Sequence, residues 1–290
     1  MTADAFSKIV ENLPPVGMAT LHGIGEPLMN EDLIDIVRIA RSSGKFGVLK
    51  VTTNGLTRSP EVYRELIAAG LNMFWVSIDS LDQATAEIIR FGTKVDKLRD
   101  RMAWFLKEAL PVEVSMVVSA YNYRSLEETL RVLYEFGNPS IHMQEFQDYG
   151  DTGGLMTAEQ RREFLETMRR ISAEMPNLRV RLPKFAQPTG QLCLAPWQRP
   201  GITVDGYLTP CCTTFDASLF AFQDLKRISL AEAWRQEPVQ QWIKNYTKTR
   251  PPMCVGCALD PRGWGNTDNT LSNRGGDQSA HHRRVEQKAF

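Results

Sequence analysis

Short apolar runs alternate with longer amphipathic segments through the first 175 residues, and this alternation restricts the fold more than any other feature of the chain. The short runs are rich in apolar and β-branched residues, which predicts strands buried on both faces. They are Met18–Leu21, Val48–Thr52, Met73–Ile78, Val112–Val118 and Ile141–Gln144. The longer segments space their apolar residues as helices do. They are Glu31–Ser42, Ser59–Ala69, Gln83–Ile89, Val95–Leu110, Arg124–Phe136 and Thr157–Glu174.

Strands that alternate with helices at this spacing need crossover connections, and such connections produce a parallel sheet. The first part of the chain is therefore predicted to be an α/β domain. A helical segment, Ala3–Leu13, precedes the first predicted strand, whereas a βα unit opens on a strand. We expect from this pattern that a strand is missing upstream.

The pattern changes after Pro176 to short strands, turns and cysteines. The predicted elements here are a short strand at Leu178–Arg181, a hairpin at Gly201–Leu208 that turns at Asp205 and Gly206, and helices at Ser229–Gln236 and Val239–Tyr246. Gly, Asn, Asp, Arg and Gln dominate from Asp260 onward, which is typical of a disordered tail. We predict an α/β domain of residues 1–180, a small cysteine-rich domain of residues 181–260 and a polar tail of residues 261–290.

All five cysteines lie in the last third of the chain. Seventeen residues separate Cys193 from Cys211, forty-two separate Cys211 from Cys254, and two separate Cys254 from Cys257. A Cys-x-x-Cys pair with two distant thiolates is typical of a four-coordinate zinc site or an iron–sulfur cluster, and the spacing does not choose between the two. The alternative of buried apolar cysteines fits Cys212 but not the whole set.

Charge and composition exclude several other classes. The 34 Lys and Arg balance the 34 Asp and Glu, so no overall positive charge favours nucleic acid or an acidic membrane as a partner. No apolar run reaches the roughly 18 residues of a membrane helix, and no signal peptide is recognisable. We therefore expect a cytoplasmic protein with neither nucleic acid nor membrane among its partners.

Polar or glycine-rich segments follow the first three predicted strands. They are Leu21–Pro27, Val51–Gly55 and Val76–Ser80. Ligands gather at the carboxyl ends of strands in parallel α/β folds, so these segments are candidates for a binding site. Each of them alone is explained as well by an ordinary turn. His22 lies in the first segment, where it is either a proton-transfer group or a hydrogen-bonded structural histidine.

The order of these motifs resembles that of radical S-adenosylmethionine (SAM) enzymes. Gly23–Pro27, Thr52–Gly55 and Ser77–Asp79 resemble segments of their barrel. The region from Cys193 to Cys257 resembles their SPASM/Twitch C-terminal extension. Full SPASM regions hold two auxiliary clusters, and this chain has cysteines for one, which makes it more similar to Twitch. The resemblance implies a partial, TIM-like (β/α) barrel without its first strand, followed by a small cluster domain.

The resemblance also implies which residues bind cofactors. In the barrel, SAM would be contacted by Gly23, Gly25, Glu26, Asn54, Ser77 and Asp79. In the second domain, Cys193, Cys211, Cys254 and Cys257 would ligate an auxiliary 4Fe-4S cluster, and Cys212 would be spare. A peptide or a small molecule would be the substrate, and flavodoxin or ferredoxin would be the electron donor.

One defining motif of the family, Cys-x-x-x-Cys-x-x-Cys, is absent, because no cysteine precedes Cys193. Two explanations compete: the sequence is truncated upstream, which we favour, or the protein is a natural relative without that cluster. On the first, a second 4Fe-4S cluster lies upstream, and the complete protein is an oxidoreductase or maturase that makes a 5′-deoxyadenosyl radical. The chain as written is then inactive. On the second, it is a non-catalytic cluster-binding or zinc-binding protein.

Overall fold

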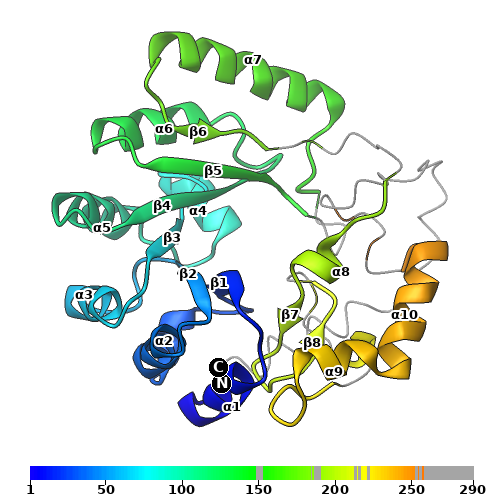
Figure 1. Cartoon of the computed structure of the whole chain (residues 1–290). Coiled ribbons are helices and arrows are strands. Elements are labelled where there is room, and N and C mark those ends of the chain that lie inside the picture. Colours follow the sequence, from blue (N-terminus) through cyan, green and yellow to red (C-terminus); the bar gives the residue numbers. More distant parts are fainter. Residues whose placement is uncertain are drawn as a thin grey trace.

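In the computed structural model, six parallel strands form a curled half-barrel, and their order in the sheet is their order in the chain. The structure describes residues 1–147, 153–183, 185, 191–211, 214, 217–220, 223–251, 254 and 257. The strands are β1 (Val16–Leu21), β2 (Phe46–Thr53), β3 (Met73–Ser77), β4 (Val112–Val118), β5 (Ser140–Glu145) and β6 (Val180–Arg181). Figure 1 shows the sheet curving around one side of the molecule. The expected partial (β/α) barrel is confirmed.

Helices cover the outer, convex face of this sheet (Figure 1). In chain order they are α1 (Ala3–Glu11), α2 (Leu33–Ser42), α3 (Pro60–Ala68), α4 (Gln83–Ile89), α5 (Val95–Lys107), α6 (Leu126–Glu135) and α7 (Ala158–Glu174), with a short 3-10 turn, η1 (Pro27–Met29), after β1. The layer between sheet and helices is the main core. Tyr63 packs edge-on against Phe74 and Phe105, with ring centroids 5.4 and 5.0 Å apart.

The helix ends agree with local capping chemistry. The side chain of Thr157 accepts a bond from the amide of Gln160, and the side chain of Gln160 returns one to the amide of Thr157. This capping box satisfies amide groups that the first turn of α7 leaves without helical partners. The predicted helices and the five predicted barrel strands are therefore present, with ends that differ by up to three residues.

The short segment that contains Leu178 supplies the sixth barrel strand. Val180 pairs with Ile141, and Arg181 pairs with His142, both in parallel. β6 thus spans the expected domain boundary at residue 180.

One expectation about the strands is wrong: they are not buried on both faces. Residues that face the helices are buried, among them Leu49, Val51, Phe74, Val76, Val114 and Met116. Their neighbours on the concave face are mostly polar and in part exposed, among them Thr52, Trp75, Ser77, Glu113, His142 and Gln144. Local sequence does not show this difference, because each strand is too short for its polar positions to form a clear alternation.

The C-terminal unit is a small, separate arrangement of short elements. They are α8 (Ala195–Gln198), β7 (Gly201–Ile202), β8 (Leu208–Thr209), η2 (Ala217–Phe220), α9 (Leu230–Arg235) and α10 (Glu237–Lys248). Figure 1 places them across from the helix-covered side of the barrel. The ring of Phe220 lies edge-on to Trp242, with centroids 5.0 Å apart, and Trp242 stacks on Tyr246 at the same distance. The predicted hairpin and both predicted helices are present. The tail of residues 261–290 and Cys212 lie outside the described residues.

The turn between β7 and β8 packs against the first helix. Gly206 has a φ of +89°, a conformation that favours glycine. A Cβ at this position would lie 3.2 Å from Ile9 Cδ1 and 3.0 Å from Lys226 Cγ. The hairpin therefore requires a residue without a side chain at its closest approach to α1.

Candidate functional site

The carboxyl edge of the half-barrel brings together most of the residues that the sequence singles out. Glu26 follows β1, Asn54 follows β2, Ser77 is the last residue of β3, and Asp79 lies two positions further on. These residues are distant in sequence but adjacent in space, because neighbouring parallel strands end at the same edge. This is the region where a parallel α/β fold binds ligands.

The glycine segment after β1 is open. A Cβ on Gly23 or Gly25 would meet no atom within 4 Å, and Gly25 has a φ of +97°. A ligand therefore has access to the backbone of this segment, while the turn at Gly25 needs a conformation that other residues rarely adopt.

The carboxylate of Glu26 is already engaged. It accepts hydrogen bonds from Thr53 Oγ1 at 2.7 Å, from the amide of Asn54 at 2.7 Å and from the amide of Leu28 at 3.2 Å. A carboxylate has about four acceptor positions, so one remains for a further donor. Glu26 thus joins the ends of β1 and β2 and keeps limited capacity to bind a cation.

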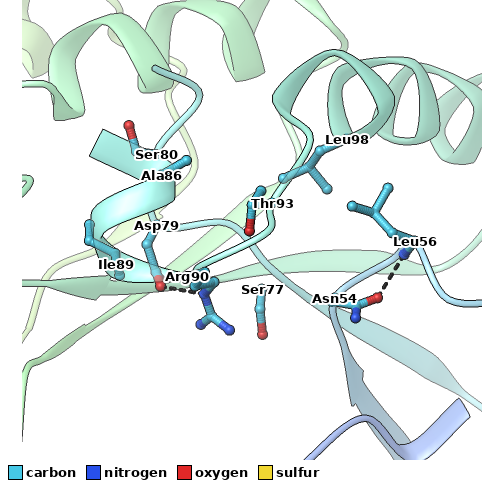
Figure 2. Close-up of a pocket in the computed structure, with 10 residues that line it drawn as sticks. All are labelled: Asn54, Leu56, Ser77, Asp79, Ser80, Ala86, Ile89, Arg90, Thr93 and Leu98. Carbon is cyan, nitrogen blue, oxygen red and sulfur yellow. Dashed lines mark hydrogen bonds and ion pairs between the residues drawn. The ribbon is translucent and has the colours of Figure 1, made fainter. Parts of the chain in front are cut away.

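A pocket lies beyond the ends of β2 and β3 (Figure 2). Its cavity volume is about 20 Å³, and it is partly open to solvent. Its lining is Asn54, Leu56, Ser77, Asp79, Ser80, Ala86, Ile89, Arg90, Thr93 and Leu98. Figure 2 shows the polar ends of Asn54, Ser77 and Arg90 along one side of this space. Three of the residues expected to contact SAM thus line one pocket, and Gly23, Gly25 and Glu26 are not part of its lining.

Asp79 holds the cation of the pocket in place. Its carboxylate lies 2.6 Å from Arg90 Nε and accepts the amide hydrogen of Val117 at 2.7 Å. The Asp79 side chain is 3 % exposed, whereas that of Arg90 is 41 % exposed. The buried carboxylate of Asp79 therefore fixes the position of the Arg90 guanidinium through an ion pair. A ligand in the pocket would contact Arg90 and not Asp79.

Sequence reasoning missed Arg90. This residue follows the last turn of α4, eleven positions after Asp79. Its only signal in the sequence is a basic residue at a helix end close to a strand-end aspartate. That signal is weak, because arginine is common at helix C-termini, where the negative end of the helix dipole stabilises a positive charge.

His22 lies near the same edge with a lowered pKa. Desolvation lowers the pKa of its imidazole, and the positive charge of Lys50 lowers it further, although the residue keeps an exposed surface. The neutral form is therefore favoured at neutral pH. A neutral imidazole suits either of the two roles left open for this residue.

The four cysteines expected to bind a cluster are all in the described C-terminal unit, and each is partly buried. Tyr246 on α10 donates a hydrogen bond to the carbonyl of Cys193 at 2.8 Å, and the amide of Cys257 donates to the carbonyl of Cys254 at 3.3 Å. Cys211 Sγ lies 3.4 Å from Thr214 Oγ1. Within the part of the chain that the structure describes, no three or more His, Cys, Asp or Glu side chains are arranged to hold a metal ion.

None of the helices in the described ranges combines the length and the apolar character that a membrane-spanning helix needs.

Comparison with family models identifies two domains in the order expected. Residues 1–133 match the radical SAM superfamily, and residues 193–258 match SPASM, an iron–sulfur cluster-binding domain. Among curated proteins, a PqqA peptide cyclase of Xanthomonas campestris is 23 % identical over 277 residues, which are 91 % of this chain and 73 % of the relative. A PqqA peptide cyclase of Gluconobacter oxydans is 25 % identical over 309 residues, 97 % of this chain and 83 % of the relative.

Solved structures show the same fold at low sequence identity. Streptococcus suis SuiB bound to S-adenosylmethionine has a TM-score of 0.66 and 15 % identity, covering 89 % of this chain and 64 % of SuiB. SuiB has also been solved with its precursor peptide SuiA. Native anSMEcpe with bound AdoMet has a TM-score of 0.68 and 13 % identity, covering 91 % of this chain and 84 % of that one. The chain therefore spans less than two thirds of the length of SuiB.

Proposed function

Because residues 1–133 match the radical SAM superfamily and residues 193–258 match an iron–sulfur cluster-binding domain, we propose that this chain binds SAM and acts in the modification of a peptide. The named relatives support a peptide as substrate, since they are PqqA peptide cyclases, and a structural neighbour binds a precursor peptide. The proposal rests mainly on the pocket beyond the carboxyl ends of β2 and β3.

The residues of that pocket fit the amino-acid end of SAM. Arg90 supplies a guanidinium for the SAM carboxylate, and its orientation is set by the buried carboxylate of Asp79. Ser77 and Asn54 add a hydroxyl and an amide on the same side. Outside the pocket lining but at the same edge of the sheet, Glu26 has one acceptor position left for the SAM ammonium group. Gly23 and Gly25 leave the backbone next to Glu26 accessible.

The barrel of this chain does not fit the cluster that cleaves SAM in this superfamily. That cluster supplies the electron for cleavage, and its ligands are thiolates, whereas no cysteine precedes Cys193. We therefore derive no step through it. We propose that the 290-residue chain by itself binds SAM without cleaving it.

The second domain has suitable donors for one auxiliary cluster. Cys193, Cys211, Cys254 and Cys257 provide four thiolates, which is the number that a 4Fe-4S cluster uses. Among the described residues, no three or more His, Cys, Asp or Glu side chains are close enough together to hold a metal ion. The four cysteine side chains would therefore have to move closer together when the cluster binds. A non-catalytic cluster-binding or zinc-binding protein is the second candidate function, favoured by the lack of thiolates in the barrel.

Calorimetry with SAM tests the pocket. Wild-type protein should bind SAM, and Arg90→Gln should raise the dissociation constant at least about tenfold, because the charge-assisted pair with the carboxylate is lost. Arg38→Gln is the matched control, since Arg38 pairs with Asp35 and Glu65 on the surface. Equal SAM affinity in wild type and Arg90→Gln would contradict the proposal. Formation of 5′-deoxyadenosine from SAM and a reductant would disprove binding without cleavage.

A further inference from the structure

Cys193 lies in an irregular segment that precedes α8. Its carbonyl accepts the hydrogen bond from the Tyr246 hydroxyl at 2.8 Å. Among the described residues, this is the single hydrogen bond that Cys193 makes. Tyr246 lies on α10, 53 residues further along the chain. The position of the Cys193 backbone therefore depends on a contact with α10.

The ring of Tyr246 makes a second contact with the same segment. It lies 5.8 Å from the ring of Trp197 on α8, four residues after Cys193, measured between centroids. It also stacks on Trp242 of α10, with an angle of 12° between the ring planes. Tyr246 is 2 % exposed, so water does not compete for its hydroxyl, and the hydrogen bond is stronger than one at the surface. Both the ring and the hydroxyl thus hold the Cys193 segment against α10.

The same helix leads to the Cys-x-x-Cys pair. Cys254 follows Tyr246 by eight residues. The amide of Cys254 donates to the carbonyl of Pro251 at 2.9 Å, and the amide of Cys257 donates to the carbonyl of Cys254 at 3.3 Å, so turns shape this part of the chain. Tyr246 therefore connects the Cys193 segment to the helix that leads into the pair.

Cys211 is held by a different set of contacts. Its carbonyl accepts hydrogen bonds from Thr209 Oγ1 at 3.3 Å and from the amide of Thr214 at 3.2 Å. A Cβ on Gly201 of β7 would lie 2.9 Å from this carbonyl oxygen, so the glycine allows the two backbones to pack directly against each other. The hairpin therefore fixes Cys211 without a contribution from Tyr246.

We infer that Tyr246 is a positioning residue for the cluster ligand Cys193; this inference rests on the proposed cluster of the second domain. A cluster can bind only when its ligand segments are ordered, and ordering a backbone segment costs conformational entropy. The contacts of Tyr246 hold the Cys193 backbone independently of the cluster, so less of this cost arises when the cluster binds. Removal of a group that orients a metal ligand lowers affinity roughly 10- to 100-fold.

The rate of iron release tests this role in the whole chain. Wild type and variants are reconstituted anaerobically with iron and sulfide, and iron release to a chelator is followed over time. Tyr246→Phe keeps the aromatic stack but lacks the hydroxyl, so it should release iron roughly tenfold faster than wild type.

Tyr123→Phe is the matched control for this substitution. Tyr123 is 4 % exposed, and its hydroxyl lies 3.1 Å from the carboxylate of Glu163 in the barrel. The control therefore loses a hydrogen bond of a buried tyrosine at a distance from the cysteines. It should release iron at the wild-type rate.

Alkylation of the cysteines gives a second readout, one that needs no metal. In the metal-free chain, iodoacetamide modifies each partly buried thiol at a rate that depends on local opening, and peptide mass spectrometry resolves Cys193 from Cys211. Tyr246→Phe should raise the rate at Cys193 about fivefold, as the loss of one hydrogen bond of ordinary strength allows. The rate at Cys211 should not change.

Equal iron release from wild type and Tyr246→Phe would overturn the inference, and so would equally accelerated release from Tyr123→Phe. An unchanged alkylation rate at Cys193 would overturn it as well. Failure of the proposed cluster looks different, because the wild type itself would then hold no iron after reconstitution.

Discussion

Asp79 lies at the carboxyl edge of the sheet, where the sequence predicts a SAM-binding residue, and its carboxylate already has partners within the protein. The resemblance implies direct contact with SAM, yet the carboxylate is buried and engaged by Arg90 and by the amide of Val117. The carbonyl of Asp79 in turn accepts a bond from the side chain of Asn122 at 2.8 Å. Asp79 thus connects β3 to β4 and to the end of α4.

Replacing Asp79 by Asn should destabilise the protein as well as the pocket. The amide still accepts the Val117 hydrogen bond but no longer balances the charge of Arg90. We expect the free energy of unfolding to fall by about 2 kcal/mol, between the values for exposed and buried ion pairs. Urea denaturation measures this loss.

The matched control for this substitution is Asp35→Asn. Asp35 pairs with Arg38, and both side chains are more than half exposed. This change should alter stability by less than about 0.5 kcal/mol. A similar loss in the two variants would show that burial of Asp79 is not the cause.

At the level of elements, a network of charged side chains joins α6 to α7. Glu127 on α6 accepts bonds from Arg131 on the same helix at 2.8 Å and from Arg170 on α7 at 2.8 Å. Glu174 on α7 also pairs with Arg131. The hydrogen bonds from Arg170 and then Arg131 lower the pKa of Glu127 to about 2.

This shift makes the contribution of Glu127 depend on pH. Because its folded pKa lies below the ordinary value of 4.5, Glu127 stabilises the protein above that value, and the contribution disappears as the pH falls toward 2. Wild type should exceed Glu127→Gln in unfolding free energy by about 1 kcal/mol at neutral pH, and the difference should vanish in acid.

Urea denaturation of both proteins between neutral pH and about pH 2 measures the difference, and other carboxylates cancel in the comparison. For Glu135→Gln, the corresponding difference from wild type should stay flat. A difference for Glu127→Gln that is constant with pH would show that the network does not shift this carboxylate.

At the level of the whole molecule, α1 connects the half-barrel to the C-terminal unit. The side chain of Asn12, just after α1, donates to the carbonyl of Leu225 at 2.9 Å, and its own carbonyl accepts the amide hydrogen of Leu230 at 3.0 Å. On the other side, Phe6 stacks on Phe46 of β2 with ring centroids 6.4 Å apart. The first helix is therefore part of both units.

Cluster assembly in the C-terminal unit gives a prediction at the same scale. After anaerobic reconstitution with iron and sulfide, wild type should hold about four iron atoms per chain. Cys254→Ser should hold less than about half of this, because one of four ligands is lost. Cys212→Ser should leave the iron content unchanged. Iron analysis decides between these outcomes, and one zinc per chain in place of iron would identify a zinc site.

Much of the fold could be predicted from local pattern. Apolar runs such as Val112–Val118 are strands, helices such as Gln83–Ile89 have the predicted ends, and the turn at Gly206 is where two short strands meet. These features depend on neighbouring residues in the chain. The sequence by itself therefore determined the α/β order, the carboxyl-edge location of Asn54, Ser77 and Asp79, and the cysteine-rich C-terminal unit.

Only the tertiary structure decided which side chains act together. Asp79 and Arg90 pair because a helix returns to the end of its strand, and Glu113 meets Trp75 and His142 because three strands align in register. The polar concave face could likewise not be predicted from the sequence, because the sequence of a short strand does not indicate which of its two faces packs against the helices. Partners this far apart in the chain come together by strand pairing and helix packing, and the hydrophobic periodicity of a single segment carries no information about them.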